Sequence, residues 1–330
     1  MKIDLVYMWA SGNDPVWMQK RNGYLPPAEQ QDMASFCKGR TAENGELKYS
    51  LRSVEMYASW INHIYIVTDG QTPEWLDTTN PRISIIDHKE ILPTDTLPTF
   101  NTTAIELGFV NIPGLSEHFL MANDDMMFNR AVEPSFFFTN DGKPICRVMK
   151  NTTAYTILKS IHNKSDSPMS TYDAIVHKAS SLITKDFGKN MLPYIQHHNI
   201  DAYSKKSATE CMQKYSGVVD ATYKNRFRSK EDFHRHAITL YAVVNGQAKM
   251  KPFSLMIDKI GRAFYKTKLF GPLESIYIGI QHRDIREQLK YLRPALVCFN
   301  DGEINTDADR SHMCGVLEDL YPQKSSFEKE

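Results

Sequence analysis

The chain has 330 residues, of which 42% are hydrophobic, 24% charged and 11% aromatic, as is ordinary for a folded globular protein. This composition excludes disordered, collagen-like and disulfide-dense classes, and the length suits about two domains or one large α/β domain with insertions. Lys and Arg together number 39, as do Asp and Glu, so the formal charge is zero. We therefore expect no nucleic-acid partner, because such a binder needs a concentrated cationic surface.

The apolar runs and the cysteines bear on location. No run approaches the roughly 18 apolar residues that span a bilayer, and the first residues read as a strand, so we expect no cleavable signal. The five cysteines are odd in number and lack a Cys-x-x-Cys pair. That usage fits reduced thiols better than a disulfide framework or a zinc site. These observations predict a cytoplasmic protein.

Apolar runs and helical spacing alternate along the first part of the chain. The predicted strands are residues 3–9, 61–67, 82–87 and 118–122. Helices are expected after an N-cap at Asn44 and over residues 103–110. Strands that alternate with helices at this spacing predict an α/β, Rossmann-like fold with a mostly parallel sheet.

The later part of the chain has a different character. Residues 151–200 look largely helical, and residues 203–268 hold 14 Lys and Arg against 5 Asp and Glu. Helical spacing returns at residues 285–292, and a buried strand is expected at 295–299. We therefore divide the chain into a core at 1–150, a mainly helical region at 151–290, and a carboxyl-terminal strand and tail at 291–330.

Polar turns follow three of the predicted strands. The first holds Asn13 and Asp14, the second is residues 69–71, and the third is residues 123–125. Ligands of open α/β sheets bind outside the carboxyl ends of the strands. The three turns are therefore expected to form one polar crevice.

Adjacent carboxylates in the third turn suggest a metal site. Asp124 and Asp125 lie between two apolar segments, where uncompensated charges are costly. A divalent cation holding a diphosphate would compensate them. The simpler alternative is a loop pair that faces water, or one Asp that caps a helix. Asp301, in an Asn-Asp-Gly turn after the last predicted strand, could add a ligand, although that tripeptide is also a plain turn signal.

Further candidates are the pair His197 and His198, the basic tripeptide of residues 226–228, and the start of the helix that is expected after Asn44. His197 or His198 could accept a proton at neutral pH, although most of the 11 histidines must be structural or surface residues. Arg228 could hold phosphate oxygens, or could simply belong to a solvated face. Arg52, further along the helix that is expected after Asn44, could bind an anion at the start of that helix. Neither a P-loop nor a Rossmann glycine triad is present, which argues against ATPase and NAD-dehydrogenase classes.

Four ordered blocks of the sequence resemble the Stealth family of sugar-phosphate transferases. That family includes bacterial capsular polysaccharide phosphotransferases and is similar to the animal N-acetylglucosamine-1-phosphotransferase. The blocks cover residues 3–17, 43–128, 196–229 and 298–328. One departure is Ser11, where the family usually has an acidic or amide residue.

The resemblance implies a glycosyltransferase type A-like fold that binds a nucleotide-sugar donor, a UDP-N-acetylhexosamine, and a glycan acceptor. It also implies transfer of hexose 1-phosphate to a sugar hydroxyl with release of UMP, with Mg²⁺ or Mn²⁺ as cofactor. By similarity, His197 is the general base and Arg228 holds the charge on the transferred phosphoryl oxygens. Asp125 binds the metal with Asp301, and Asp124 is a catalytic residue that also helps to hold the metal. The donor would be bound by Asn13, Asp14, Asn44, Glu46, Arg52, Asp69, Gly70, Gln71 and Asn123.

Two other functions remain open at this stage. The first alternative is a metal-dependent glycosyltransferase that attacks the anomeric carbon and releases UDP from the same crevice. The second is a non-catalytic protein that binds an anionic polymer through the Lys and Arg side chains of residues 203–268. The same basic region could also rest on anionic lipid at the inner face of the cell membrane.

Overall fold

A five-stranded sheet forms the centre of the computed structural model, which describes residues 1–25, 42–150, 170–196, 198–254, 264–267, 272–302 and 304–330. The strand order is β3-β2-β1-β4-β8. In chain order the strands are β1 (Ile3–Met8), β2 (Ile64–Thr68), β3 (Ile83–Asp87), β4 (His118–Asn123) and β8 (Asp201–Ser204). The first four are parallel, and β8 is antiparallel to β4. The predicted α/β class with a mostly parallel sheet is thereby confirmed.

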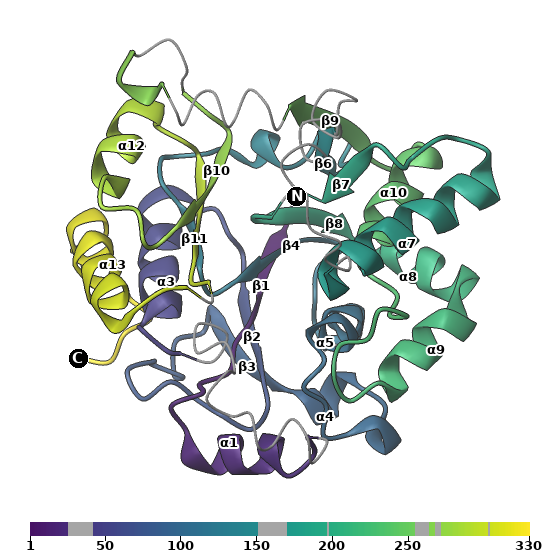
Figure 1. Cartoon of the computed structure of the whole chain (residues 1–330), viewed down its shortest axis with the longest axis horizontal. Helices are drawn as coiled ribbons and strands as arrows, with labels where there is room; N and C mark the ends of the chain where they lie inside the picture. The colour runs from purple at the N-terminus through teal and green to yellow at the C-terminus, as the bar shows by residue number, and fades with distance from the viewer. Residues whose placement is uncertain (26–41, 151–169, 197, 255–263, 268–271, 303) are drawn as a thin grey trace.

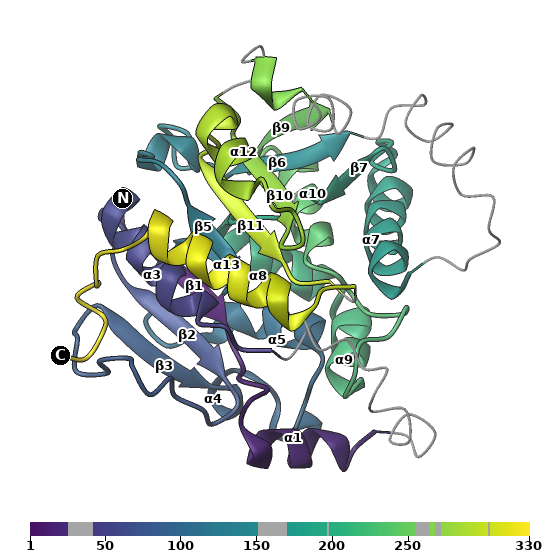
Figure 2. The same ribbon diagram turned by 60° about the vertical axis from the view of Figure 1, so that its left-hand side comes forward.

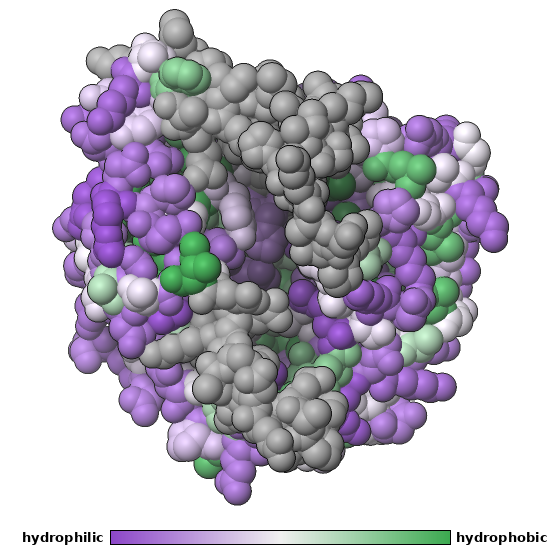
Figure 3. Space-filling model, in the orientation of Figure 1, coloured by the Kyte–Doolittle hydropathy of each residue, from purple (hydrophilic) through white to green (hydrophobic). Residues whose placement is uncertain are grey.

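Helices cover both faces of this sheet, as Figures 1 and 2 show. On one side lies α3 (Glu46–Tyr57), and next to it α12 (Ile285–Leu292) and α13 (Asp307–Leu320) pack in a separate core that contains Val297. On the other side lie α5 (Thr102–Gly108), α7 (Thr171–Phe187), α8 (Lys205–Lys214), α9 (Ser216–Lys224) and α10 (His236–Val244). The shorter α1 (Pro15–Asn22) and α4 (His88–Ile91) follow β1 and β3. Figure 3 shows a recess lined by hydrophilic residues between the two sides.

Burial of both faces explains why the central strands are almost wholly apolar. Successive side chains of β1 alternate between two cores. Leu5 packs in the core that contains Leu47 of α3, whereas Val6 packs in the core that contains Ile105 of α5. The sheet therefore has no polar face, and ligand-binding groups are left to its edge.

Two three-stranded sheets flank the centre. One has the order β10-β11-β5 and the other β7-β6-β9. Their strands are β5 (Met126–Phe128), β10 (Ser275–Gly279), β11 (Leu296–Asn300), β6 (Ile145–Lys150), β7 (Tyr194–Gln196) and β9 (Lys249–Ser254). Because β5 follows β4 after two residues, its pairing with β11 brings the carboxyl-terminal part of the chain to the end of β4.

The expected elements differ from the structure in a few places. The predicted N-cap of α3 at Asn44 is wrong: Gly45 holds that position with φ of 83°, and the Asn44 amide bonds to the Glu46 carboxylate instead. Residues 126–128, expected only as an apolar group, form strand β5. The expected helices of residues 151–200 fall partly outside the described residues, which contain α7 and β7 here.

The predicted three-part division of the chain stays a prediction. Strand β8 comes from the expected helical region, yet it pairs with β4 of the core through Phe119 and Tyr203. Within the described residues, no helix is long and apolar enough to cross a bilayer.

Candidate active site

The turns after β1 and β2 meet at the carboxyl edge of the sheet. The side chain of Gln71 both accepts a hydrogen bond from the Ser11 amide (2.9 Å) and donates one to the Ser11 carbonyl (3.0 Å). It also donates to Asp14 (3.0 Å), whose carboxylate caps the amides of Val16 and Trp17. Gln71 and Asp14 thus hold the rim of the crevice in shape.

Asp69 and Gly70 complete the turn after β2. The Asp69 carboxylate lies 2.8 Å from the Lys20 ammonium group. Gly70 has φ of 72°, a conformation that costs a residue with a Cβ atom, and a Cβ there would lie 3.7 Å from the Asp87 carboxylate. This turn is therefore compact and close to the end of β3.

The segment before α3 runs along the same edge. Asn13 donates to the Glu43 carbonyl at 3.2 Å, and the Trp9 indole donates to the Glu43 carboxylate at 2.5 Å. The Glu46 carboxylate accepts from both the amide and the side chain of Asn44. The turn after β1 and the start of α3 thereby form one wall of the site.

Three carboxyl groups at or near this wall have raised pKa values. Burial, followed by the charges of Asp125, Glu46 and Glu43, raises the pKa of Asp124 well above its usual range. Burial raises the pKa of Asp125 to about 6 and that of Glu46 to about 7. Buried carboxyl groups with raised pKa values are stabilised in their charged forms by a nearby cation.

Asp125 joins the carboxyl end of β4 to β11. Its carbonyl accepts from the Phe299 amide at 3.0 Å, and its Oδ2 accepts from the Cys298 thiol at 3.3 Å. Its Oδ1 is buried and has no hydrogen-bond partner among the described residues. An unpartnered buried carboxylate oxygen is costly. This oxygen is available to a divalent cation, which prefers carboxylate oxygens, and the charge of Asp125 reaches Asp124 next to it.

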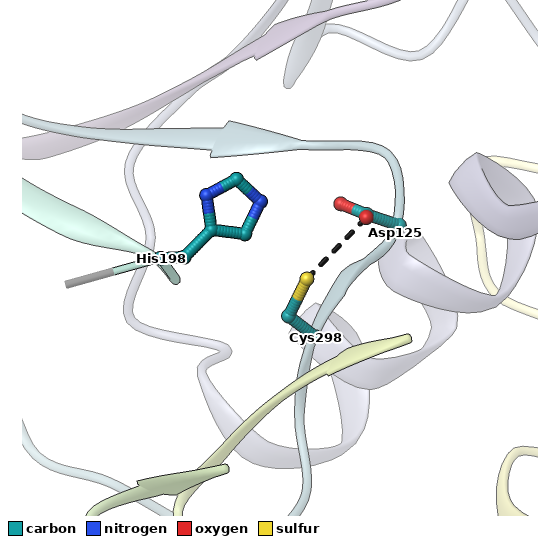
Figure 4. Close-up of side chains that lie close together, drawn as sticks. All are labelled: Asp125, His198 and Cys298. Atoms are coloured by element: carbon teal, nitrogen blue, oxygen red, sulfur yellow. Dashed lines mark hydrogen bonds between the residues drawn. The ribbon is translucent and has the colours of Figure 1, made fainter. Parts of the chain in front are cut away.

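His198 faces Asp125 across the site (Figure 4). Its ring lies within 4.8 Å of ligand atoms of Asp125 and Cys298. The rings of Tyr172 and Tyr277 meet it edge to face, with centroid separations of 6.2 and 5.3 Å. Burial, then the charges of Arg235 and Arg228, lowers the pKa of His198 to about 4. The imidazole is therefore neutral at pH 7 and can accept a proton. The expected base His197 lies outside the described residues.

A cationic group borders the imidazole. Arg228 is exposed and bonds to the Thr102 hydroxyl at the start of α5. Behind it, the buried Arg235 pairs with Glu106 at 3.2 Å and with Asp201 at 3.1 Å. The structure thus brings Arg228 into the electrostatic surroundings of His198.

Asp301 and Arg52 have strong partners of their own. The Asp301 carboxylate accepts two bonds from Arg310, at 2.7 and 3.1 Å. The Arg52 guanidinium donates to both oxygens of Glu328, at 2.8 and 2.9 Å, and to the carbonyl of Tyr321. Geometry therefore gives both residues a role in holding the carboxyl-terminal segment, and their predicted roles in metal and donor binding remain predictions.

Two hollows differ in their relation to this site. Asn123 lines a small pocket with Met8, Glu106 and Arg235, next to the acidic cluster. A broad hollow that includes Lys2 and His118 lies at the opposite, amino ends of β1 and β4. Only the first contains a residue predicted for the site.

Sequence reasoning missed several residues that the structure brings to the site. His198 was recognised only as half of a pair, and Cys298, Glu43 and Arg235 were not singled out. Glu43 and Cys298 stand at the first positions of two of the four blocks, which was the available signal. Arg235 had no signal beyond the basic region.

Comparisons with known proteins identify the family of this chain. Residues 40–146 match the family model described as Stealth protein CR2, conserved region 2. The chain is 30% identical to exopolysaccharide phosphotransferase cps2G of Lactiplantibacillus plantarum, over 99% of this chain and 96% of that protein. It is also 30% identical to capsular polysaccharide phosphotransferase WcwK of Streptococcus pneumoniae, over 99% of each chain.

Among solved structures, the galactosyltransferase LgtC in complex with donor and acceptor sugar analogues aligns with 98% of this chain and 96% of its own. The TM-score is 0.45 and the identity 11%. Because the identity to the phosphotransferases extends along almost the whole of both chains, this chain belongs to the Stealth protein family and is a transferase enzyme.

Proposed function

We propose that the chain transfers an N-acetylhexosamine 1-phosphate from a UDP-sugar to a hydroxyl of a glycan acceptor in polysaccharide synthesis. A phosphodiester forms and UMP leaves. The observation that carries the proposal is the closeness of Asp125 to the neutral imidazole of His198, whose ligand atoms lie within 4.8 Å of each other. The names of the relatives support sugar-phosphate transfer in polysaccharide synthesis.

The carboxylates bind the cofactor in this proposal. Asp124 and Asp125 hold Mg²⁺ or Mn²⁺, with Glu46 beside them and Asp301 at the margin. When bound, the ion neutralises charge on the donor diphosphate. Asn13, Asp14, Asp69, Gly70 and Gln71 shape the rim against which the donor lies, and Asn123 lies beside the carboxylates.

His198 accepts the proton of the acceptor hydroxyl as its oxygen attacks the β-phosphorus. Burial lowers the pKa of His198 to about 4, so the imidazole is unprotonated at pH 7. The negative charge of a bound donor phosphate would raise that pKa toward the value that suits a general base. The neighbouring His197, which the sequence predicts as the base, lies outside the described residues and stays a prediction. Arg228, an exposed cation whose charge reaches His198, holds the equatorial oxygens of the transferred phosphoryl group.

A second candidate function is an ordinary metal-dependent glycosyltransferase, which would use the same acidic crevice. Incubation of the enzyme with UDP-N-acetylglucosamine, acceptor glycan and Mg²⁺ separates the two functions. We expect UMP by nucleotide chromatography and a phosphodiester signal by ³¹P NMR. Formation of UDP with a glycosidic product would instead establish the second candidate.

Location is a further part of the proposal. A cytoplasmic enzyme could rest its basic residues 203–268 on anionic lipid at the inner face of the membrane. We expect sedimentation with phosphatidylserine vesicles at low salt and release at high salt. Recovery of all the protein in the supernatant at both salt concentrations would remove the lipid contact.

A further inference from the structure

Three metal-ligating side chains of different chemistry meet beside the proposed base. Asp125 follows β4, His198 follows β7, and Cys298 lies in β11, yet their ligand atoms lie within 4.8 Å of one another. Figure 4 shows the three side chains pointing toward a common centre. The proposed function uses Asp125 and His198 but gives the thiol no part.

The spacing of these atoms suits a small tetrahedral ion. Bonds of about 2.0 Å to nitrogen or oxygen and about 2.3 Å to sulfur place neighbouring ligand atoms about 3.5 Å apart. The Cys298 sulfur already lies 3.3 Å from Oδ2 of Asp125. A small movement of the His198 ring would complete three corners of the tetrahedron, because its ligand nitrogen is within 4.8 Å of both partners.

The chemistry of the set favours a softer ion than magnesium. Mg²⁺ selects oxygen ligands and octahedral geometry, whereas a thiolate with an imidazole and a carboxylate suits Zn²⁺ or Co²⁺. Oδ1 of Asp125 is buried without a hydrogen-bond partner among the described residues. That oxygen is an independent sign that the site receives a cation. Asp125 and His198 are both partly exposed, so a cation can reach them from solvent.

We propose that Asp125, His198 and Cys298 form a binding site for a thiophilic divalent cation of the Zn²⁺ class, and that occupancy of this site inhibits the enzyme. On binding, the Cys298 thiol releases its proton to solvent, the thiolate and the imidazole nitrogen donate electron pairs to the ion, and no oxidation occurs. The imidazole lone pair is then no longer available to a hydroxyl proton. Only the inhibition rests on the proposed function; the binding of the cation does not.

Cobalt provides a direct test of the ligands without any assay of turnover. Titration of the metal-free protein with Co²⁺ is expected to produce a sulfur-to-cobalt charge-transfer band in the near ultraviolet. The band should reach its maximum at one equivalent of Co²⁺. The Cys298→Ser variant should lose this band. Cys211→Ser, which alters another buried thiol in a separate core, should keep it.

Absence of the band from the wild-type protein, or its persistence in Cys298→Ser, would overturn the proposed site. Circular dichroism establishes that each variant is folded, and Cys298→Ala supplies a second replacement if the serine variant is not. The wild-type spectrum alone can refute the site, so the proposal stays testable even if no Cys298 variant folds.

Inhibition is measured as the ratio of the turnover rates with and without Zn²⁺ at saturating Mg²⁺. The rate of each variant with Zn²⁺ is compared with the rate of the same variant without Zn²⁺. We expect the zinc concentration for half inhibition to rise at least tenfold in Cys298→Ser and to stay unchanged in Cys211→Ser. Zinc binding without any fall in wild-type turnover would refute the inhibition. A cobalt band with no sugar-phosphate transfer would refute the proposed function and leave the metal site standing.

Discussion

His198 is the imidazole that lies beside Asp125, where the proposed reaction needs a general base. Its ring is held between Tyr172 and Tyr277, and its lowered pKa of about 4 keeps it neutral over the physiological range. General-base catalysis by a positioned side chain contributes about 10²- to 10⁴-fold. The two adjacent histidines can therefore be told apart by their variants.

We expect His198→Gln to lower kcat by about 10²- to 10⁴-fold, because the glutamine amide cannot accept the proton. The measurement is UMP release with saturating donor and acceptor. His177→Gln, an exposed histidine on α7, is the matched control and should retain the wild-type rate. A loss confined to His197→Gln would return the role of base to His197.

Arg228 offers a second test at this scale. Its replacement by Ala removes a cation from the phosphoryl side of His198, and loss of one such stabilising group costs about 10²- to 10³-fold in kcat. Lys230→Ala removes another exposed cation two residues away and should have little effect. Equal rates for the two variants would place Arg228 outside the reaction.

At the scale of elements, helix α3 connects the site to the end of the chain. Its first residue, Glu46, belongs to the acidic cluster, while Arg52 two turns later binds Glu328 and the Tyr321 carbonyl. The side chains of Arg52 and Glu328 are 7% and 4% exposed, so their pairing is buried. Breaking a buried pair leaves one charge uncompensated and is strongly destabilising.

We therefore expect Arg52→Ala to lower the free energy of unfolding by about 3 to 5 kcal/mol, as measured in urea. The control Arg286→Ala breaks an exposed pair with Asp319 and should cost about 1 kcal/mol or less. The KM for the donor should change little in the folded Arg52 variant. A large rise in that KM at unchanged stability would instead support the donor-binding role that the sequence predicts.

At the scale of the whole molecule, the carboxylate cluster makes stability depend on pH and metal. The pKa values of Glu46 and Asp125, about 7 and 6, exceed those of unfolded carboxyl groups, about 4. Between these values the folded chain keeps protons that the unfolded chain releases, so the free energy of unfolding falls as pH rises from about 4 to about 7.

Magnesium should reverse this loss, because a bound cation stabilises the ionised carboxylates. We expect MgCl₂ to raise the melting temperature more at pH 8 than at pH 5, where the carboxyl groups are protonated. The Glu46→Gln variant should show a weaker dependence of its metal-free melting temperature on pH. Equal stabilisation by magnesium at both pH values would contradict a metal site at this cluster.

Local patterns in the sequence determined most of the central fold. The apolar runs mark β1 to β4 within a few residues, because strands buried on both faces must be apolar throughout. The polar turns that follow them were expected to share one edge, and the Gln71 hydrogen bonds to Ser11 and Asp14 join two of them there. Parallel strands leave no other place for these turns.

Only the tertiary structure decided which polar groups share surroundings. Cys298 donates a hydrogen bond to Asp125, which lies 173 residues away in the sequence, and Glu328 pairs with Arg52, which lies 276 residues away. Neither pairing leaves a trace in local periodicity. A side chain's charge state and availability depend on burial and on partners that the fold brings from elsewhere in the chain. For that reason the sequence determined the framework and its acidic edge, whereas the packing of distant segments decided which imidazole, thiol and carboxylates meet there.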